Sequence, residues 1–297
     1  MSKGILVFAR NNSEIDYVKQ AYFLAKQAKH ILNLPVTVVT DSVVHLKSTY
    51  TDYNEVFDKV ISIVWKESDL TEDTTFSRSE NHSAKLYFDG TIAKKRLQFK
   101  NETRTLAYEL TPYDETLILD TDVVIVNDTF NQCFTQEHDF LIYQKAYDLA
   151  GFRDYSEFDF ISDTSVEFYW ATCVFFRKTQ TNKIFFDLLQ HIQDNWRHYN
   201  SIFQINRSVY RNDHAFSIAI HIMNGYQSGD FAKPMPGKLF YTTDKDILQK
   251  LYKDEFFVLI EKEKYIGEYT PIKFKGNNLH VMNKYSLNRC IDEVLNV

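Results

Sequence analysis

Two aspartates, Asp120 and Asp122, stand one residue apart at the end of an apolar run, residues 117–119. Such a run predicts a buried strand, and alternate side chains of an extended backbone lie on the same side. Two neighbouring carboxylates cost free energy unless a cation lies between them. Hard oxygen ligands suit Mg²⁺ or Mn²⁺, which keep coordination positions open for substrate phosphates. The spacing therefore predicts a metal–diphosphate site that uses both aspartates.

The elements that come before this pair read as a strand, a helix and a second strand. Residues 4–9 predict the first strand, and residues 36–39 predict the second. Between them, Ser13 predicts a helix N-cap and Pro35 ends the helix. Apolar residues recur at helical spacing in this stretch, namely Ile15, Val18, Tyr22, Ala25, Ala28 and Leu32. With a third strand expected at 60–65, the opening predicts an α/β fold with a parallel sheet.

The stretch between the third strand and the aspartates is less regular. Residues 67–90 are polar and predict a loop, whereas residues 91–110 predict one helix or two consecutive ones. Arg96, Lys100 and Arg104 recur there at four-residue intervals, which would stack three cations on one helix face. Either these cations bind an anion, or they lie on a solvated helix face and pair with Glu102 and Glu109.

The second half of the chain continues the mixture of strands and helices. Residues 140–143, 168–177 and 256–260 predict strands. Residues 181–199 predict an amphipathic helix with Ile184 on its inner face, and Asp213 opens a further helix that Gly225 ends. No repeat and no linker divides the sequence into independent units.

Composition limits the class of protein. The chain has 297 residues, 44% of them hydrophobic, so a large core is available and disorder is not expected. A formal charge of −6 gives no support to nucleic-acid binding by the whole chain. The three cysteines match no zinc motif and no run approaches 18 apolar residues. We therefore expect reduced thiols, no membrane span and a cytoplasmic location (the host cytoplasm if the chain is virus-encoded).

Three segments together resemble the GT-A glycosyltransferases, especially the glycogenin-like, family-8-like branch. They are residues 38–41, the phrase from Thr111 to Asp122, and the closing stretch from His280 to Lys284. The resemblance spans most of the chain and is most specific at the aspartates. It implies a Rossmann-like nucleotide-binding sheet merged with a smaller acceptor-side α/β lobe. The corresponding halves are residues 1–126 and 127–297, in one merged domain closed by the C-terminal metal-ligand segment.

The resemblance also implies roles for particular residues. Asp120, Asp122 and His280 correspond to the metal ligands, and an imidazole ligand favours Mn²⁺ over Mg²⁺. Lys284 lies where a cation contacts the departing diphosphate. Here the sequence departs from the family spacing H-x-x-G-x-x-K, because His280 and Lys284 are only four residues apart with no glycine between them.

The donor implied is a nucleotide sugar, with a UDP-sugar as the usual choice of the family. The carboxyl end of the first strand is the expected nucleotide position in an open α/β sheet. Arg104 would place its cationic side chain near the donor, and Lys100 is a weaker candidate for the same role. Arg104 is also a predicted catalytic residue. The complete donor-binding set is Phe8, Ala9, Arg10, Asn11, Asp41, Lys100, Asp120, Thr121 and Lys284.

Asp213 is the second predicted catalytic residue. It lies at the start of a helix, where related enzymes hold a sugar or acceptor hydroxyl, and it also fits plain N-capping. In a retaining enzyme it would position the substrate, and in an inverting enzyme it would be the candidate base. Trp170 stands where the family shows an Asn-Ala-Gly-like strand, and that phrase is absent here. The donor sugar and the stereochemical course therefore stay open.

The resemblance therefore implies a metal-dependent glycosyltransferase, and we expect its acceptor to be an intracellular hydroxyl. The acceptor is a polysaccharide precursor, a protein, a small metabolite or, in a virus, a hydroxylated DNA base; the basic segments 94–96 and 262–275 keep DNA open as a partner. Two alternatives remain. A phosphohydrolase of the haloacid dehalogenase type would use Asp120 as nucleophile and Asp122 as acid and base. A catalytically inactive nucleotide-sugar binding module would retain the site without turnover.

Overall fold

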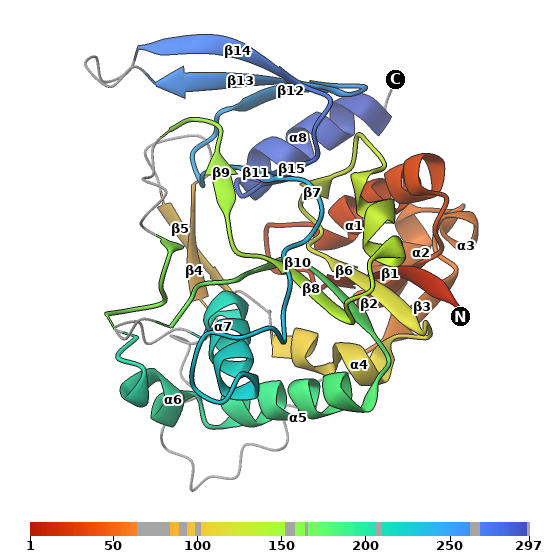
Figure 1. The fold of residues 1–297 in the computed structure, drawn as a ribbon. Helices are drawn as coiled ribbons and strands as arrows, with labels where there is room; N and C mark the ends of the chain where they lie inside the picture. Colours follow the sequence, from red (N-terminus) through yellow and green to blue (C-terminus); the bar gives the residue numbers. More distant parts are fainter. Residues whose placement is uncertain are drawn as a thin grey trace, which may run out of the picture.

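The computed structural model describes residues 1–63, 84–88, 94–98, 102–151, 158–163, 166–205, 210–261 and 268–295 (Figure 1). Its centre is a six-stranded sheet in the order β3-β2-β1-β6-β10-β8. Four strands are parallel, namely β1 (Lys3–Ala9), β2 (Val36–Thr40), β3 (Lys59–Ser62) and β6 (Glu115–Leu119). Strand β10 (Trp170–Arg177) pairs antiparallel with β6, and β8 (Phe140–Tyr143) pairs antiparallel with β10. This topology confirms the predicted α/β class.

The register of the sheet places the ends of β1 and β6 together. Val7 pairs with Leu119, so Arg10 and Asp120 follow neighbouring strands at the same edge. Strands β1, β2 and β6 consist almost entirely of buried residues, as expected for a sheet with helices on both faces. Loops at the carboxyl ends of such strands form the usual ligand-binding crevice.

The first helix forms as predicted but begins later. Helix α1 runs over Tyr17–Gln27 and continues as a π-helical turn, Ala28–Leu32. Its N-cap is Asp16, whose carboxylate accepts a hydrogen bond from the Lys19 N–H, so the prediction of Ser13 as N-cap was wrong. The predicted apolar stripe is buried along its whole length. Two short helices, α2 (Val43–Thr49) and α3 (Tyr53–Val56), separate β2 from β3.

The predicted helix over 91–110 was largely wrong. Strands β4 (Ala84–Phe88) and β5 (Lys94–Gln98) pair antiparallel, and helical backbone begins only at the 3₁₀ turn Glu102–Leu106 and α4 (Ala107–Leu110). Arg96 therefore lies in a strand, which rules out the predicted helical stack of cations, and Lys100 lies outside the described residues. The sequence signal for a hairpin was the Asp89-Gly90 pair between the two strands.

Three helices of the second half, α5 (Gln180–Asp194), α6 (Trp196–Ile202) and α7 (Asn212–Met223), lie together on one side of the central strands in Figure 1. The predicted helix over 181–199 is two helices, α5 and α6, joined at Asn195. Ile184 is half-exposed rather than inward. Helix α7 packs against α5 and β10.

A second sheet brings distant segments of the chain together. Its order is β7-β15-β11-β9, with β7 (Val123–Val124), β15 (Leu279–Val281), β11 (Leu239–Thr242) and β9 (Ala146–Asp148). Beyond it, β12 (Leu248–Tyr252), β13 (Glu255–Glu261) and β14 (Tyr269–Lys275) form an antiparallel meander that contacts α8 (Lys284–Leu295). The 3₁₀ segment Thr129–Thr135 precedes β8.

Strands from both predicted halves belong to the same sheet, because β6 pairs with β10. The boundary at residues 126 and 127 stays a prediction. Among the helices that the structure describes, none has the length and apolar character needed to cross a bilayer.

Candidate active site

The aspartate pair lies in a turn at the carboxyl end of β6. The Asp120 N–H donates to the Thr172 carbonyl of β10 at 2.9 Å, and the Val123 N–H donates to the Asp120 carbonyl at 3.2 Å. These backbone bonds fix the turn between β6 and β7. As a result, both carboxylates are held at the edge of the sheet where β1 also ends.

Pairing of β7 with β15 brings His280 to the aspartates. His280 lies opposite Val123 in the antiparallel register, and the Val281 N–H donates to the Asp122 carbonyl at 2.9 Å. The His280 Nε2 atom is 3.0 Å from Asp122 Oδ2. One ligand atom from each of Asp120, Asp122 and His280 lies within 4.8 Å of the others. The sheet thus joins residues that are 158 positions apart in sequence.

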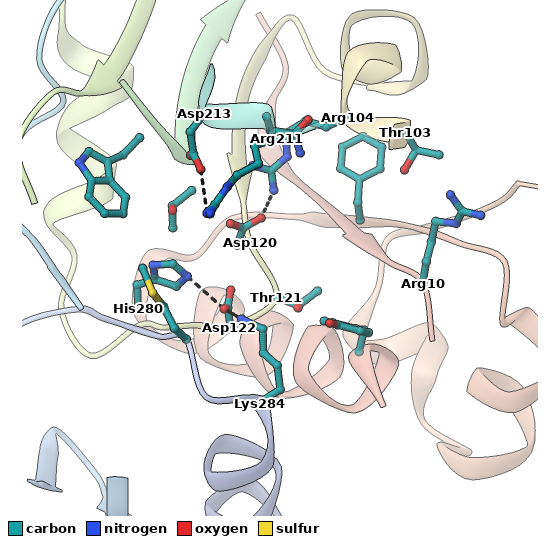
Figure 2. A pocket seen from close by; sticks show the side chains of 16 residues that line it. Arg10, Thr103, Arg104, Asp120, Thr121, Asp122, Arg211, Asp213, His280 and Lys284 are labelled. Carbon is teal, nitrogen blue, oxygen red and sulfur yellow. Dashed lines mark hydrogen bonds and ion pairs between the residues drawn. The ribbon is translucent and has the colours of Figure 1, made fainter. Parts of the chain in front are cut away.

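Each carboxylate also has a cationic partner. Asp122 is almost fully buried and forms an ion pair with Lys284, the first residue of α8. The Asn283 side chain caps this helix by accepting the Ser286 N–H at 2.8 Å, which fixes the backbone that carries Lys284. Asp120 forms an ion pair with the buried Arg104. The two aspartates therefore face different cations, as Figure 2 shows.

Arg104 links three parts of the site. Besides Asp120, its guanidinium donates to the Ala171 carbonyl at the start of β10. Burial lowers the pKa of Arg104 to about 10, an effect that the negative charge of Asp213 opposes. The side chain remains a cation at neutral pH. Its fixed position, rather than its charge alone, distinguishes it from a surface arginine.

Asp213 lies in the first turn of α7 and holds the start of β10. Its Oδ1 accepts the Ala171 N–H at 2.9 Å, and its Oδ2 is 3.5 Å from a guanidinium nitrogen of Arg211. Both carboxylate oxygens therefore have a donor nearby. The side chain does not cap its own helix, because no side-chain cap bond occurs and the N-cap position is Arg211.

These groups line one pocket of about 970 Å³, part of which is open to solvent (Figure 2). It contains nine residues that the sequence predicted for the site: Phe8, Arg10, Arg104, Asp120, Thr121, Asp122, Asp213, His280 and Lys284. Thr121 donates to Gln20 Oε1 of α1 at 3.1 Å, which ties the aspartate turn to the first helix. Arg10 lies across the pocket from His280 in this view.

Three other predicted donor-binding residues do not line the pocket. Ala9 is fully buried in β1. The side-chain Oδ1 of Asn11 accepts the Val18 N–H at 3.0 Å, so this side chain supports α1. Asp41 forms an ion pair with Arg10 at 3.3 Å and orients the Arg10 side chain. Lys100, the fourth, is outside the described residues.

Seven pocket residues were not among the predicted site residues. They are Tyr17, Thr103, Trp170, Thr172, Arg211, Asn212 and Met282. Thr103 and Asn212 are immediate sequence neighbours of predicted residues, and Trp170 stands where the resembled family shows an Asn-Ala-Gly-like strand. Trp170 both lines the pocket and packs in the core, with its ring 5.2 Å from that of Tyr241.

The donor set of Asp120, Asp122 and His280 fits a divalent metal. Mn²⁺ and Mg²⁺ both accept carboxylate ligands, and an imidazole is more typical of Mn²⁺ than of Mg²⁺ sites. Zn²⁺ also accepts both ligand types. The Asp120 side chain is about one-third exposed at 32%, whereas that of Asp122 is 3% exposed. An ion held by this group would be accessible from the pocket on the Asp120 side. The identity of the metal belongs to the proposal below.

Comparison with known proteins gave structural similarities only. No family model and no curated protein matches the sequence. The glycosyltransferase GlyE of Streptococcus pneumoniae TIGR4 is similar at a TM-score of 0.44 and 10% identity, over 79% of this chain and 45% of that one. This chain therefore spans less than half of GlyE.

Two further structures give comparable values. The galactosyltransferase LgtC, solved with donor and acceptor sugar analogs, matches at a TM-score of 0.42 and 10% identity, over 73% of this chain and 70% of its own. Mouse xyloside xylosyltransferase 1 matches at a TM-score of 0.42 and 10% identity, over 85% of this chain and 88% of its own. All three of these proteins are glycosyltransferases.

Proposed function

We propose that this chain is a divalent-metal-dependent glycosyltransferase that takes a sugar from a nucleoside diphosphate donor. The observation that supports this most directly is the convergence of Asp120, Asp122 and His280 in one pocket. A UDP-sugar with Mn²⁺ is the proposed donor and metal. Whether the sugar is a hexose or a pentose stays open.

The metal would be held by Asp120, Asp122 and His280. When bound, it would neutralise charge on the donor diphosphate and make that group a better leaving group. The protein adds two cations that line the same pocket, Arg104 and Lys284. Preorganised positive groups stabilise the charge that develops as the sugar–phosphate bond breaks.

The nucleoside is proposed to lie toward the end of β1. Phe8 and Arg10 line this side of the pocket, and Arg10 is held in place by Asp41. Burial lowers the pKa of Arg10, and its ion pair with Asp41 opposes the shift. The guanidinium thus remains a fixed hydrogen-bond donor for a ribose or phosphate oxygen.

We propose that Asp213 positions a sugar or acceptor hydroxyl. Its carboxylate already accepts the Ala171 N–H and lies near Arg211, and these two contacts hold the side chain in place. A side chain held in this way is suited to positioning a hydroxyl. This role agrees with a retaining course, as the family-8-like resemblance implies.

The acceptor is proposed to be a hydroxyl of a saccharide or other polar molecule. The basic segment 262–275 gives little support to DNA, because Lys273 pairs with Glu255 at 2.9 Å and Lys275 lies 3.3 Å from the same carboxylate. Residues 262–267 lie outside the described chain.

The test is a screen of nucleotide sugars with and without Mn²⁺, which measures thermal stabilisation and release of free nucleoside diphosphate. The proposal predicts that one donor stabilises the protein only with metal and is slowly hydrolysed. Release of phosphate from simple esters would indicate the phosphohydrolase, and tight binding without turnover would indicate the binding module. Stabilisation that does not need metal would overturn the proposal.

A further inference from the structure

A second pocket lies at the opposite end of α7 from Asp213. It contains about 640 Å³ of space, part of it open to solvent. One wall is the segment before β10, with Glu167 and Tyr169, and the other is the last turns of α7 and the residues that follow it. The complete lining is Glu167, Tyr169, Ser217, Ile220, His221, Asn224, Tyr226, Gln227 and Ser228.

The lining is polar but carries no positive side chain among the described residues. Glu167 supplies one carboxylate, whose Oε2 accepts the Tyr169 hydroxyl at 3.0 Å and the Gln144 amide at 3.3 Å. Burial lowers the pKa of His221, so its imidazole is neutral near pH 7. A lining of this kind repels phosphate and carboxylate groups and offers hydrogen bonds to hydroxyls.

Tyr226 adds an exposed aromatic surface beside these groups. Its side chain is 67% exposed, and its backbone has φ = +63°, a conformation that non-glycine residues rarely adopt. The preceding Gly225 also has positive φ, and the Tyr226 N–H donates to the His221 carbonyl at 2.9 Å. The helix end thus fixes an unusual tyrosine, with its ring 5.9 Å from that of His221.

An exposed ring beside a carboxylate and an amide matches the chemistry of a sugar. A pyranose has a face of C–H groups that packs on an aromatic ring and a rim of hydroxyls that bind carboxylate and amide groups. Asn224 contributes the amide, whose oxygen accepts the Phe231 N–H at 3.0 Å. Its NH₂ group has no other partner among the described residues and can donate to a ligand.

The two pockets share a wall but are separate. Tyr169 lines the second pocket and Trp170 the first, as expected for consecutive residues of an extended backbone. Ser217 closes the wall by accepting the Tyr169 N–H at 2.8 Å and donating to the Asp213 carbonyl at 2.7 Å. Asp213 and His221 are eight residues apart on α7, about 12 Å along the helix axis.

We propose that this second pocket is a binding site for a neutral saccharide, distinct from the site of the donor. The inference concerns binding alone and does not depend on the transfer reaction. It assigns the stacking surface to Tyr226 and the hydroxyl recognition to Glu167 and Asn224.

The test is saturation-transfer-difference NMR with maltotetraose, cellotetraose, chitotetraose and N-acetyllactosamine, without metal or donor. Glucuronate and glucosamine serve as charged probes. Tyr226→Phe keeps the ring, whereas Tyr226→Asn removes it and tolerates positive φ. Glu167→Gln removes the charge. Tyr252→Ala is the matched control, since Tyr252 is an exposed tyrosine of β12 that is 52% exposed and outside both pockets.

The proposal expects at least one neutral oligosaccharide to bind, with affinity lowered about tenfold or more by Tyr226→Asn and by Glu167→Gln. Tyr226→Phe, Tyr252→Ala and the active-site variant Asp122→Asn should bind as the original protein does. Thermal unfolding confirms that each variant is folded. The proposal is overturned if no neutral saccharide binds, if only a charged probe binds, or if binding survives both pocket substitutions. Loss of binding in Asp122→Asn alone would place the sugar in the first pocket and also overturn it.

Discussion

The two ends of α7 border pockets of opposite electrostatic character. At its N-terminal end, Asp213 lines a pocket that also contains Arg10, Arg104, Arg211 and Lys284. At its C-terminal end, the lining has one carboxylate, a neutral histidine and no cation among the described residues. The first suits a metal and an anionic diphosphate, and the second suits a neutral polyol. One helix thus separates two linings of different charge, about 12 Å apart along its axis.

The largest effect is expected from Asp122→Asn, which should change ligand binding in the first pocket alone. This substitution keeps the shape of the side chain and removes its charge. We expect Mn²⁺-dependent stabilisation by the donor to disappear and turnover to fall by about a thousandfold, because metal and diphosphate are no longer held. Thermal shift and nucleoside diphosphate release measure both effects.

The matched control is Asp246→Asn. Asp246 also pairs with a cation of α8, namely Arg289 at 2.9 Å, but lies outside both pockets. Equal losses in the two variants would mean that Asp122 is only part of a structural ion pair. The isosteric change is preferred to Asp122→Ala, because asparagine fills the space of the buried side chain and leaves no cavity.

The fold was more predictable than the site. The aspartates were recognisable because strand and acids are adjacent in sequence, and the β-α-β opening follows from local patterns. His280 came only from the family resemblance, because its approach to Asp122 depends on the pairing of β15 with β7. Tyr17 and Arg211 were missed because a pocket wall is set by tertiary packing, which leaves no periodic signal.

The second pocket had no sequence signal at all. Its residues come from two segments, 167–169 and 217–228, that carry no motif. The wrong helix over 91–110 has a different origin, since helical charge spacing there outweighed the Asp89-Gly90 turn signal.

A second substitution separates the two roles of Lys284. In this structure Lys284 neutralises Asp122, a predicted metal ligand. Lys284→Gln should tighten Mn²⁺ binding, because a competing cation is removed, and lower turnover by about a hundredfold, because a cation near the diphosphate is lost. Mn²⁺ titration by electron paramagnetic resonance and kinetics give the two readouts. Weaker Mn²⁺ binding would show that Lys284 supports the ligands rather than competes with the metal.

Ionic strength should change ligand affinity differently in the two pockets, by a smaller factor than the substitutions above. The first pocket binds charge with charge, so raising ionic strength from low to physiological values should weaken donor binding severalfold. Saccharide binding in the second pocket should change less than about twofold, since the ligand is neutral. Calorimetric titrations at several NaCl concentrations test this. A salt-sensitive saccharide would contradict the contrast between the two linings.

The smallest effect concerns His221 and the stability of the protein. Because burial lowers its pKa in the folded state, the unfolded chain binds more protons near pH 6. The free energy of unfolding should therefore fall as pH drops below about 6.5, where an unfolded histidine becomes protonated. His221→Asn should reduce this acid sensitivity in urea titrations at pH 7.5 and 5.5. Equal sensitivity in both proteins would show that Glu167 cancels the effect of burial.

The most direct test is the position of a metal in crystals grown with Mn²⁺ and a nucleoside diphosphate. Anomalous diffraction at the manganese edge should give a peak coordinated by Asp120, Asp122 and His280, with Lys284 moved away from Asp122. A peak elsewhere, or none with the diphosphate bound, would contradict the account.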